Sequence, residues 1–252
     1  MPSVFSIIGT AWDFYKKQPV LNSILLWMLI LPFTGMYIVE ESVGINETLG
    51  EFAWKETDLR PLLLIGAAEF LLTIIIIWGI ASITVVGKRL IASKAGRNRS
   101  SFTVVRKEGS KYIVNMFLTG ILRDCFTIFW GILLIIPGVI YAIRTAFYNV
   151  TIVCEGLGYR KALRRSKEVV KGHTWTTFWH LLGLVIVIFF PAIIVAASVN
   201  ELIRGMDTRL LFAANIIANT VLSYAILLFA LATIILYGEL KKLPSPNPNP
   251  KR

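Results

Sequence analysis

Four charged residues lie inside long apolar stretches of this 252-residue sequence, where their side chains could carry chemistry. They are Glu69, Arg123, Asp124 and Arg144. Within a membrane each such charge costs about 2.5–3.5 kcal/mol on insertion scales, so these residues are candidates for a proton or ion relay or for a polar substrate cavity. The alternative is structural: the charges pair to fix helix packing, or the arginines extend to the lipid headgroups. We favour the structural interpretation.

The depth of these residues predicts one particular ion pair. At 1.5 Å per residue, Glu69 lies about 10 Å from the outer end of its apolar stretch, and Arg144 lies about 9 Å from the same side. Because their charges are opposite, we expect an ion pair between Glu69 and Arg144. Arg123 and Asp124 are adjacent and point about 100° apart on a helix, so we expect them to have separate partners, or water.

Residue patterns for catalysis are missing from the sequence. The two histidines, His173 and His180, are seven positions apart, whereas a helical metal-binding pair needs three or four. There is no His-Glu-x-x-His motif, Gly-x-Ser-x-Gly motif or phosphate-binding loop. Cys125 and Cys154 both fall in apolar stretches, so no disulfide is expected. We therefore expect no catalytic residue, no metal and no cofactor.

The composition indicates which elements must position these residues. Hydrophobic residues make up 56% of the chain and charged residues 16%, against about a quarter charged in soluble proteins. The mean hydropathy of +0.68 also excludes a disordered chain. We expect an all-α polytopic membrane helical bundle, a single domain over 1–243, with a disordered cytoplasmic tail over 244–252. A span needs about 20 apolar residues, which predicts about six transmembrane helices, at 20–38, 62–86, 112–136, 139–154, 174–199 and 210–240.

The basic residues predict the orientation of the chain. The net charge is +11, and twenty of the 26 Lys and Arg residues fall before the first span, in the segments 87–111 and 155–173, or at the C-terminal end. These segments alternate with the others across the predicted spans, so the positive-inside rule places both termini in the cytoplasm. A basic face could also bind nucleic acid, but topology alone demands the same pattern, so we expect no nucleic-acid partner.

Three of the basic segments have the periodicity of amphipathic helices. They lie between Pro2 and Pro19, after Ser101, and over 158–172, and each precedes a pair of spans. Such helices lie in the membrane interface, which makes anionic lipid headgroups the expected partner at about 1 kcal/mol per cation. The order predicts a threefold helix-hairpin repeat, although any six-span chain with cytoplasmic ends shows a similar alternation. In the third segment the expected lipid-facing residues are Arg160, Lys161, Arg164, Arg165, Lys167 and Lys171.

One stretch of the sequence resembles a known group of proteins. It begins with Leu133-Leu-Ile-Ile-Pro-Gly-Val-Ile-Tyr141 and continues through Arg144, Glu155-Gly156, Ser166 and Gly172-His-Thr-Trp175. This text, over about residues 100–180, resembles prokaryotic six-span proteins of unknown function. That group is related to the membrane domain of some glycerophosphoryl diester phosphodiesterases. The resemblance implies a prokaryotic plasma membrane and a non-catalytic role, because the phosphodiesterase chemistry belongs to a separate soluble barrel that has no counterpart here.

The residues of this motif also have structural interpretations. We expect Pro137-Gly138 to form a tight outer turn, and Ser166 to let the third amphipathic helix pack closely on the bundle. We expect Gly172 to end that helix and Trp175 to anchor the next span at the interface. The sequence favours a non-enzymatic membrane protein that acts through lipid or membrane-protein contacts. The alternatives are a transporter or permease, which requires a central cavity reaching the buried charges, and a membrane-embedded enzyme.

Overall fold

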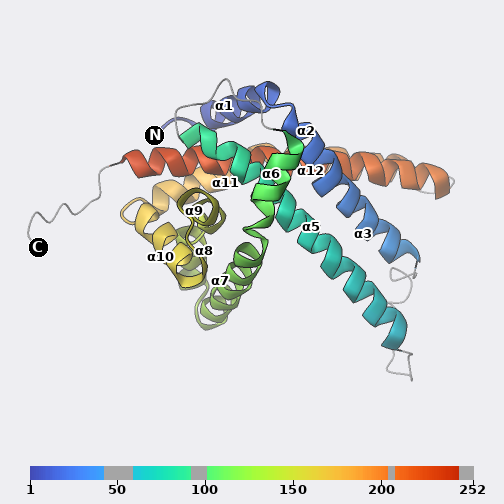
Figure 1. Cartoon of the computed structure of the whole chain (residues 1–252), viewed down its shortest axis with the longest axis horizontal. Coiled ribbons are helices and arrows are strands. Elements are labelled where there is room, and N and C mark those ends of the chain that lie inside the picture. The colour runs from blue at the N-terminus through green and yellow to red at the C-terminus, as the bar shows by residue number, and fades with distance from the viewer. Residues whose placement is uncertain (43–58, 92–100, 204–207, 244–252) are drawn as a thin grey trace, which may run out of the picture.

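The computed structural model describes residues 1–42, 59–91, 101–203 and 208–243, and within these ranges the regular structure is helical (Figure 1). Six segments in the described part of the chain are long and apolar enough to cross a membrane. They are Val20–Glu40, Leu63–Ile91, Ile113–Leu133, Ile135–Glu155, Thr174–Val199 and Phe212–Lys242. The predicted all-α architecture with six candidate spans is therefore confirmed. The predicted tail, 244–252, lies outside the described residues.

The first hairpin consists of two antiparallel arms. One arm runs through α2 (Val20–Leu25), the π-helical turn η1 (Leu26–Ile30) and α3 (Leu31–Ser42), and the other is α5 (Leu59–Ile91). A Cβ atom at Gly79 of α5 would lie 2.9 Å from the Cβ and the carbonyl oxygen of Met28. The glycine therefore permits close backbone approach, as small residues commonly do in membrane helix pairs.

The second hairpin corrects the predicted position of its turn. Helix α7 (Ile113–Leu133) is followed by Leu134, whose extended backbone (φ −157°, ψ 124°) connects it to α8 (Ile135–Arg144). Pro137 and Gly138, predicted to form the turn, instead lie in the first turns of α8. Proline is tolerated in the first turn of a helix because its missing N–H has no partner within the helix there. The prediction of a Pro137-Gly138 turn is therefore wrong.

Gly138 has a packing role in this hairpin, and a pair of substitutions can test it. A Cβ atom at Gly138 would lie 2.8 Å from the Cα and N atoms of Gly131 on α7, whereas a Cβ atom at Gly131 has open space around it. Gly138→Ala should therefore lower the free energy of unfolding by about 1–3 kcal/mol through overpacking. Gly131→Ala should leave it unchanged or slightly raised. Thermal unfolding of both purified variants measures the difference; equal midpoints would contradict the close contact.

The fourth candidate span is interrupted, which also differs from the predicted continuous helix over 139–154. Helix α8 ends at Arg144, residues 145–147 form turns, and the chain resumes as α9 (Tyr148–Glu155). A break in a membrane helix frees backbone polar groups, which then need partners from neighbouring elements.

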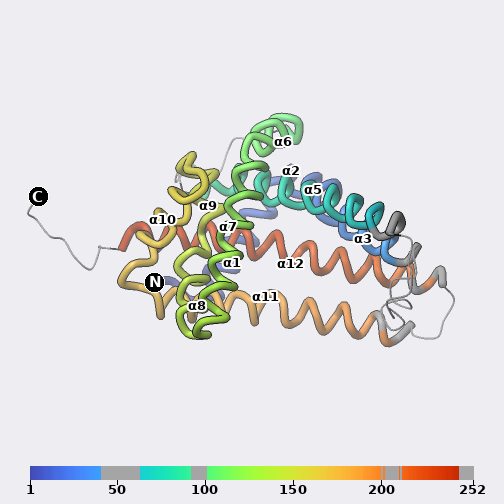
Figure 2. The backbone as a smooth tube through the Cα atoms, turned by 90° about the horizontal axis from the view of Figure 1, so that it is seen from below, coloured from blue at the N-terminus to red at the C-terminus, as the bar shows by residue number. Residues whose placement is uncertain are grey.

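The third hairpin consists of α11 (Thr174–Ile203) and α12 (Thr208–Lys242). These two helices make the most extensive helix–helix contact in the described structure. The three hairpins converge at one end and spread apart at the other (Figure 1). The α7–α8 hairpin runs across the direction of α11 and α12 in both views (Figures 1 and 2). Large apolar side chains on the spread arms are exposed, among them Leu63, Phe70, Ile132, Ile135 and Ile193. This is the surface expected of helices that lipid tails surround.

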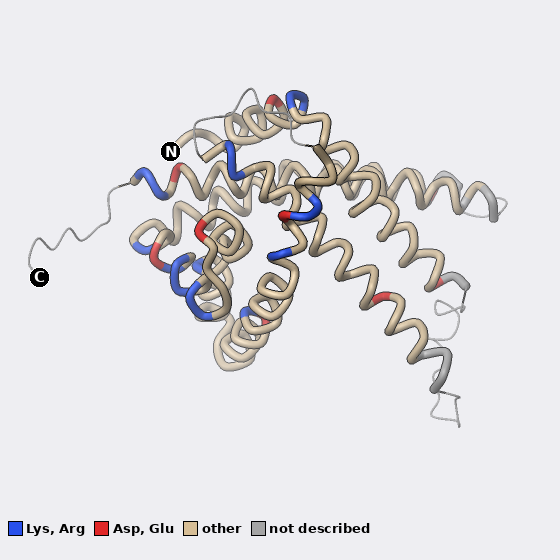
Figure 3. The backbone as a smooth tube through the Cα atoms, viewed as in Figure 1, with Lys and Arg blue, Asp and Glu red and all other residues tan. Residues whose placement is uncertain are grey.

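Three short helices lie where the hairpins converge, and each precedes a hairpin in the chain. They are α1 (Val4–Lys17), α6 (Phe102–Ser110) and α10 (Tyr159–Val170). Each buries one side, and α10 buries Ala162, Leu163, Ser166 and Val170. The core at this end includes Phe147, Ile152, Leu231 and Tyr237, all almost fully buried. Lys and Arg residues gather around this end, whereas the described parts of the long arms carry few (Figure 3).

Candidate functional site

The four predicted membrane charges do not form one cluster. Among the described residues no ion pair joins Glu69 on α5 to Arg144 on α8. Instead the Arg144 Nε donates to Thr174 Oγ1 at 3.3 Å, at the start of α11. The predicted pair rested on a depth for Arg144 that was counted from a turn at Gly138. The chain instead turns at Leu134, and Arg144 ends α8 beside Thr174, the first residue of α11.

Arg123 and Asp124 were predicted to have separate partners, but they pair with each other. The Arg123 Nη1 lies 3.0 Å from Asp124 Oδ1, and its Nε donates to Thr145 Oγ1 at 3.3 Å. The guanidinium also lies over the ring of Tyr148, 5.6 Å from its centroid. The length of the arginine side chain lets it reach back to its neighbour despite the angle between their Cα–Cβ bonds. Arg123 thereby connects α7 to the break in the fourth span.

A small hollow of about 230 Å³ lies between α5, α7 and α9 and reaches Asp124. Tyr148 and Asn149 also line it. The Asp124 side chain is 62% exposed, and the buried Asn149 Oδ1 has no hydrogen-bond partner in the described part of the chain. Of the four membrane charges, Asp124 is therefore the one that a small polar solute in this hollow would meet.

Ser166 bridges the break between α8 and α9. Its hydroxyl donates to the Arg144 carbonyl oxygen at 2.9 Å and accepts from the Phe147 N–H at 3.2 Å. These two backbone groups flank the interruption, and the Ser166 side chain is completely buried. Thr151 adds a second link, from its Oγ1 to the Ala162 carbonyl oxygen at 3.2 Å. The predicted close packing of α10 is confirmed, and the two hydrogen bonds explain why a hydroxyl stands at this position.

Glu155 joins three helices at the converging end. Its Oε2 accepts from the Arg165 Nε at 2.8 Å, and its Oε1 accepts from the Tyr237 hydroxyl at 2.6 Å and from the Lys241 Nζ at 2.9 Å. Only 18% of the Glu155 side chain is exposed. Hydrogen bonding to this carboxylate raises the pKa of Arg165. The Glu155 carboxylate thus connects α9 to α10 and α12. We call Glu155, Arg165, Tyr237 and Lys241 the Glu155 hub.

Two glycines of the motif occupy backbone conformations that favour glycine. Gly156 follows α9 at φ +69°, and Gly172 follows α10 at φ +85°. A left-handed residue after a helix is a common helix end, and glycine adopts it without steric cost. The expected role of Gly172 in ending the third short helix is confirmed. Trp175, the second residue of α11, is 65% exposed, and its anchoring role remains a prediction.

The six predicted lipid-facing cations of the third short segment divide into two groups. Arg165 and Lys167 are half-buried: Arg165 belongs to the Glu155 hub, and the Lys167 Nζ lies 4.1 Å from the centroid of the Tyr141 ring. The other four are exposed, and we call them the α10 basic face. They are Arg160, Lys161, Arg164 and Lys171.

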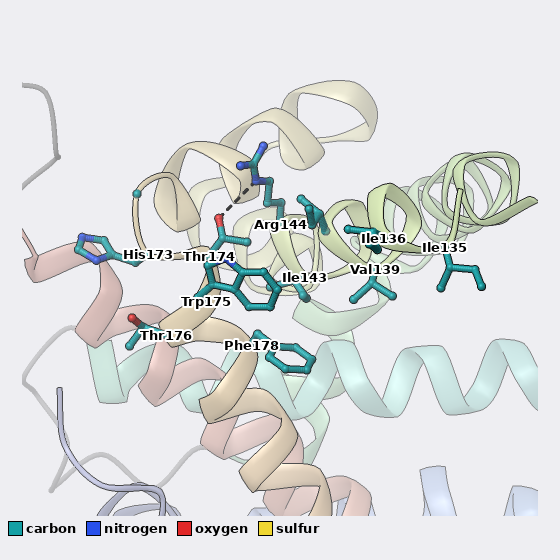
Figure 4. Close-up of a pocket in the computed structure, with 12 residues that line it drawn as sticks. Ile135, Ile136, Val139, Ile143, Arg144, His173, Thr174, Trp175, Thr176 and Phe178 are labelled. Atoms are coloured by element: carbon teal, nitrogen blue, oxygen red, sulfur yellow. Dashed lines mark hydrogen bonds between the residues drawn. The ribbon is translucent and has the colours of Figure 1, made fainter. Parts of the chain in front are cut away.

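A groove of about 450 Å³ runs between α8 and the start of α11 (Figure 4). Ile136, Val139 and Ile143 line it from α8, and Trp175 and Phe178 line it from α11. Arg144 lies at one end of this row of apolar side chains and Ile135 at the other (Figure 4). The groove lies on the flank of the molecule, and neither Glu69 nor Asp124 lines it.

Two residues of the Glu155 hub could not be predicted from the sequence motif alone. Tyr237 and Lys241 complete the Glu155 hub from 82 and 86 positions away. The nearest residue of the motif, Trp175, lies 62 positions before Tyr237 in the sequence. Comparisons with protein-family models, with curated proteins and with solved structures find no match to this chain.

Proposed function

We propose that this chain is a non-enzymatic integral membrane protein that acts through contacts of its basic end with anionic lipid headgroups. The observation that carries the proposal is the α10 basic face. Three of its exposed cations project from the side of α10 opposite the buried residues, and the fourth, Lys171, directly follows the helix. Each cation near an anionic surface contributes about 1 kcal/mol.

The packing of α10 supports this role, because the helix is held on its buried side. Ser166 binds it to the break in the fourth span, and Arg165 binds it to Glu155. The cations are therefore presented by a fixed helix rather than by a loop, which lowers the ordering cost of binding. We further propose a prokaryotic plasma membrane with both termini in the cytoplasm, supported by the gathering of basic residues at one end (Figure 3). The relation to the phosphodiesterase membrane domain remains part of this proposal.

The test is the lipid composition retained around the protein. The full chain is reconstituted in bilayers of equal phosphatidylglycerol and phosphatidylcholine, extracted in mild detergent, and its co-purified lipids are counted. We expect phosphatidylglycerol to be enriched several-fold over phosphatidylcholine. Replacing the α10 basic face with glutamines should lower this enrichment at least twofold. The control variant carries Lys16→Gln and Lys17→Gln, at the two basic residues that end α1. This variant should lower the phosphatidylglycerol enrichment less. Equal lipid ratios in all three proteins would contradict the proposal.

A transporter is the second candidate, and the hollow at Asp124 is the observation that favours it. In proteoliposomes with an entrapped pH dye and an imposed membrane potential, a lipid-contact protein should show no proton flux above that of empty vesicles. A flux that Asp124→Asn abolishes would instead establish a path through the hollow. Cys125→Ser, at the neighbouring exposed position, provides the matched control.

A further inference from the structure

We propose that the groove between α8 and α11 holds one anionic glycerophospholipid, with its phosphate at Arg144 and one acyl chain along α8. This inference deepens the proposed function, because it assigns a single defined lipid site beside the general contact of the α10 basic face.

The groove has the shape and lining that an acyl chain requires. Its volume of about 450 Å³ lies within the range of known ligand pockets. Val139 and Ile143 face Trp175 and Phe178 across it (Figure 4). Ile135, at the far end, is 78% exposed, so the groove continues onto the apolar surface of the hairpin arms. A chain that enters from the bilayer can therefore lie in the groove without crossing a polar barrier.

The other end of the groove has the charge that a phosphate requires. Arg144 is exposed, and its Nε donates to the neutral hydroxyl of Thr174, so its charge is not compensated by a carboxylate. Burial and then the positive charge of Arg144 lower the pKa of Lys167, whose Nζ lies 4.1 Å from the centroid of the Tyr141 ring. Neither cation forms an ion pair within the described ranges of the chain. The uncompensated guanidinium of Arg144 at this end of the groove favours an anion beside it.

The start of α11 adds to this positive end. Thr174, Trp175 and Thr176 line the groove and are the first three residues of a 30-residue helix. The first backbone N–H groups of a helix have no acceptor within it, and they favour anions together with the helix dipole. A phosphate beside Arg144 would therefore meet a guanidinium and these donors at once.

The position of the groove selects a lipid over other amphiphilic partners. Its cationic end adjoins the short helix that carries the α10 basic face, at the level where headgroups are expected. Its apolar part opens on the arms, whose large exposed side chains require lipid tails around them. An occupant that matches both ends carries its negative charge at one end of a flexible apolar chain, which describes an anionic phospholipid.

Native mass spectrometry of the full chain released from nanodiscs of equal phosphatidylglycerol and phosphatidylcholine tests this site. We expect one phosphatidylglycerol to remain bound per chain under activation that removes the others. Arg144→Gln should reduce this species about tenfold, because a charge-assisted hydrogen bond is lost. Val139→Trp, at an exposed position, should reduce it by filling the groove while Arg144 stays in place. Gel filtration and thermal unfolding confirm that each variant is folded.

The matched control is Arg160→Gln with Lys161→Gln on the α10 basic face, which should lower the total of enriched anionic lipid but keep the single retained molecule. Unchanged retention in both Arg144→Gln and Val139→Trp would overturn the groove site and leave the proposed function standing. Unchanged enrichment in the control, with the retained lipid lost in Arg144→Gln, would overturn the role of the α10 basic face and leave the groove site standing. Retention of phosphatidylcholine as well as phosphatidylglycerol, or a dimer that Val139→Trp dissociates, would also overturn the inference.

Discussion

Glu155→Gln is expected to lower the free energy of unfolding by about 2–3 kcal/mol. Removing one charge from a buried group of ion pairs costs about 3–5 kcal/mol, because the partner charges stay uncompensated. The amide oxygen of glutamine can still accept from Tyr237, but Arg165 and Lys241 lose their carboxylate. The side chains of Arg165 and Lys241 are 33% and 46% exposed, so water relieves part of this cost. The substitution should also loosen α10, because Arg165 is its contact with the carboxylate.

Thermal unfolding of the purified protein in detergent measures the effect, with limited proteolysis between α9 and α10 as a local readout. Glu168→Gln is the matched control, because the Glu168 carboxylate also pairs with arginines, at 3.7 Å to Arg164 and 3.5 Å to Arg165, but is 52% exposed. Exposed pairs contribute about 0–1 kcal/mol. If the two variants unfold at the same temperature, the Glu155 hub does not hold the three helices together.

Ser166→Ala is expected to cost about 2–4 kcal/mol. The substitution removes both hydrogen bonds across the break and leaves the Phe147 N–H and the Arg144 carbonyl without the partner that they have here. Each buried unsatisfied group costs about 1–3 kcal/mol. Ser166→Val should cost more, because the side chain is fully buried and the second methyl group has no space.

The control for this pair of variants is Ser110→Ala. The Ser110 hydroxyl also donates to a backbone carbonyl, that of Lys107, but it is exposed and the bond is local. Its removal should change the free energy of unfolding by less than about 0.5 kcal/mol. A Ser166→Ala variant as stable as Ser110→Ala would show that the break between α8 and α9 does not depend on α10.

The six candidate spans were predictable because hydropathy over about 20 residues decides whether a helix can cross a bilayer. The turn of the second hairpin was not, because a Pro-Gly pair fits both a turn and the first turn of a helix. The contact that decides between them is made by Gly131, which lies on the other helix. A local signal cannot report a packing contact between two helices.

The candidate site likewise has residues that the sequence could indicate and contacts between helices that it could not. The sequence singled out Glu155 and Ser166 through a motif, but two of the three partners of Glu155 lie more than 80 positions away on α12. The predicted Glu69–Arg144 pair was wrong because the depth of Arg144 was counted from a turn at Gly138, whereas the chain turns at Leu134 and Arg144 contacts the start of α11. The break after Arg144 was also missed, because hydrogen bonds from α10 stabilise it and the hydropathy of the fourth span does not indicate it.

An electron-density map of the protein, crystallised from a lipidic mesophase that contains phosphatidylglycerol, tests the central claim of lipid contact most directly. We expect a phosphate peak beside Arg144, continuous acyl-chain density along Val139 and Ile143, and headgroups against the α10 basic face. An empty groove, together with a water-filled path from the hollow at Asp124 to one side of the membrane, would contradict the account and establish the transporter in its place.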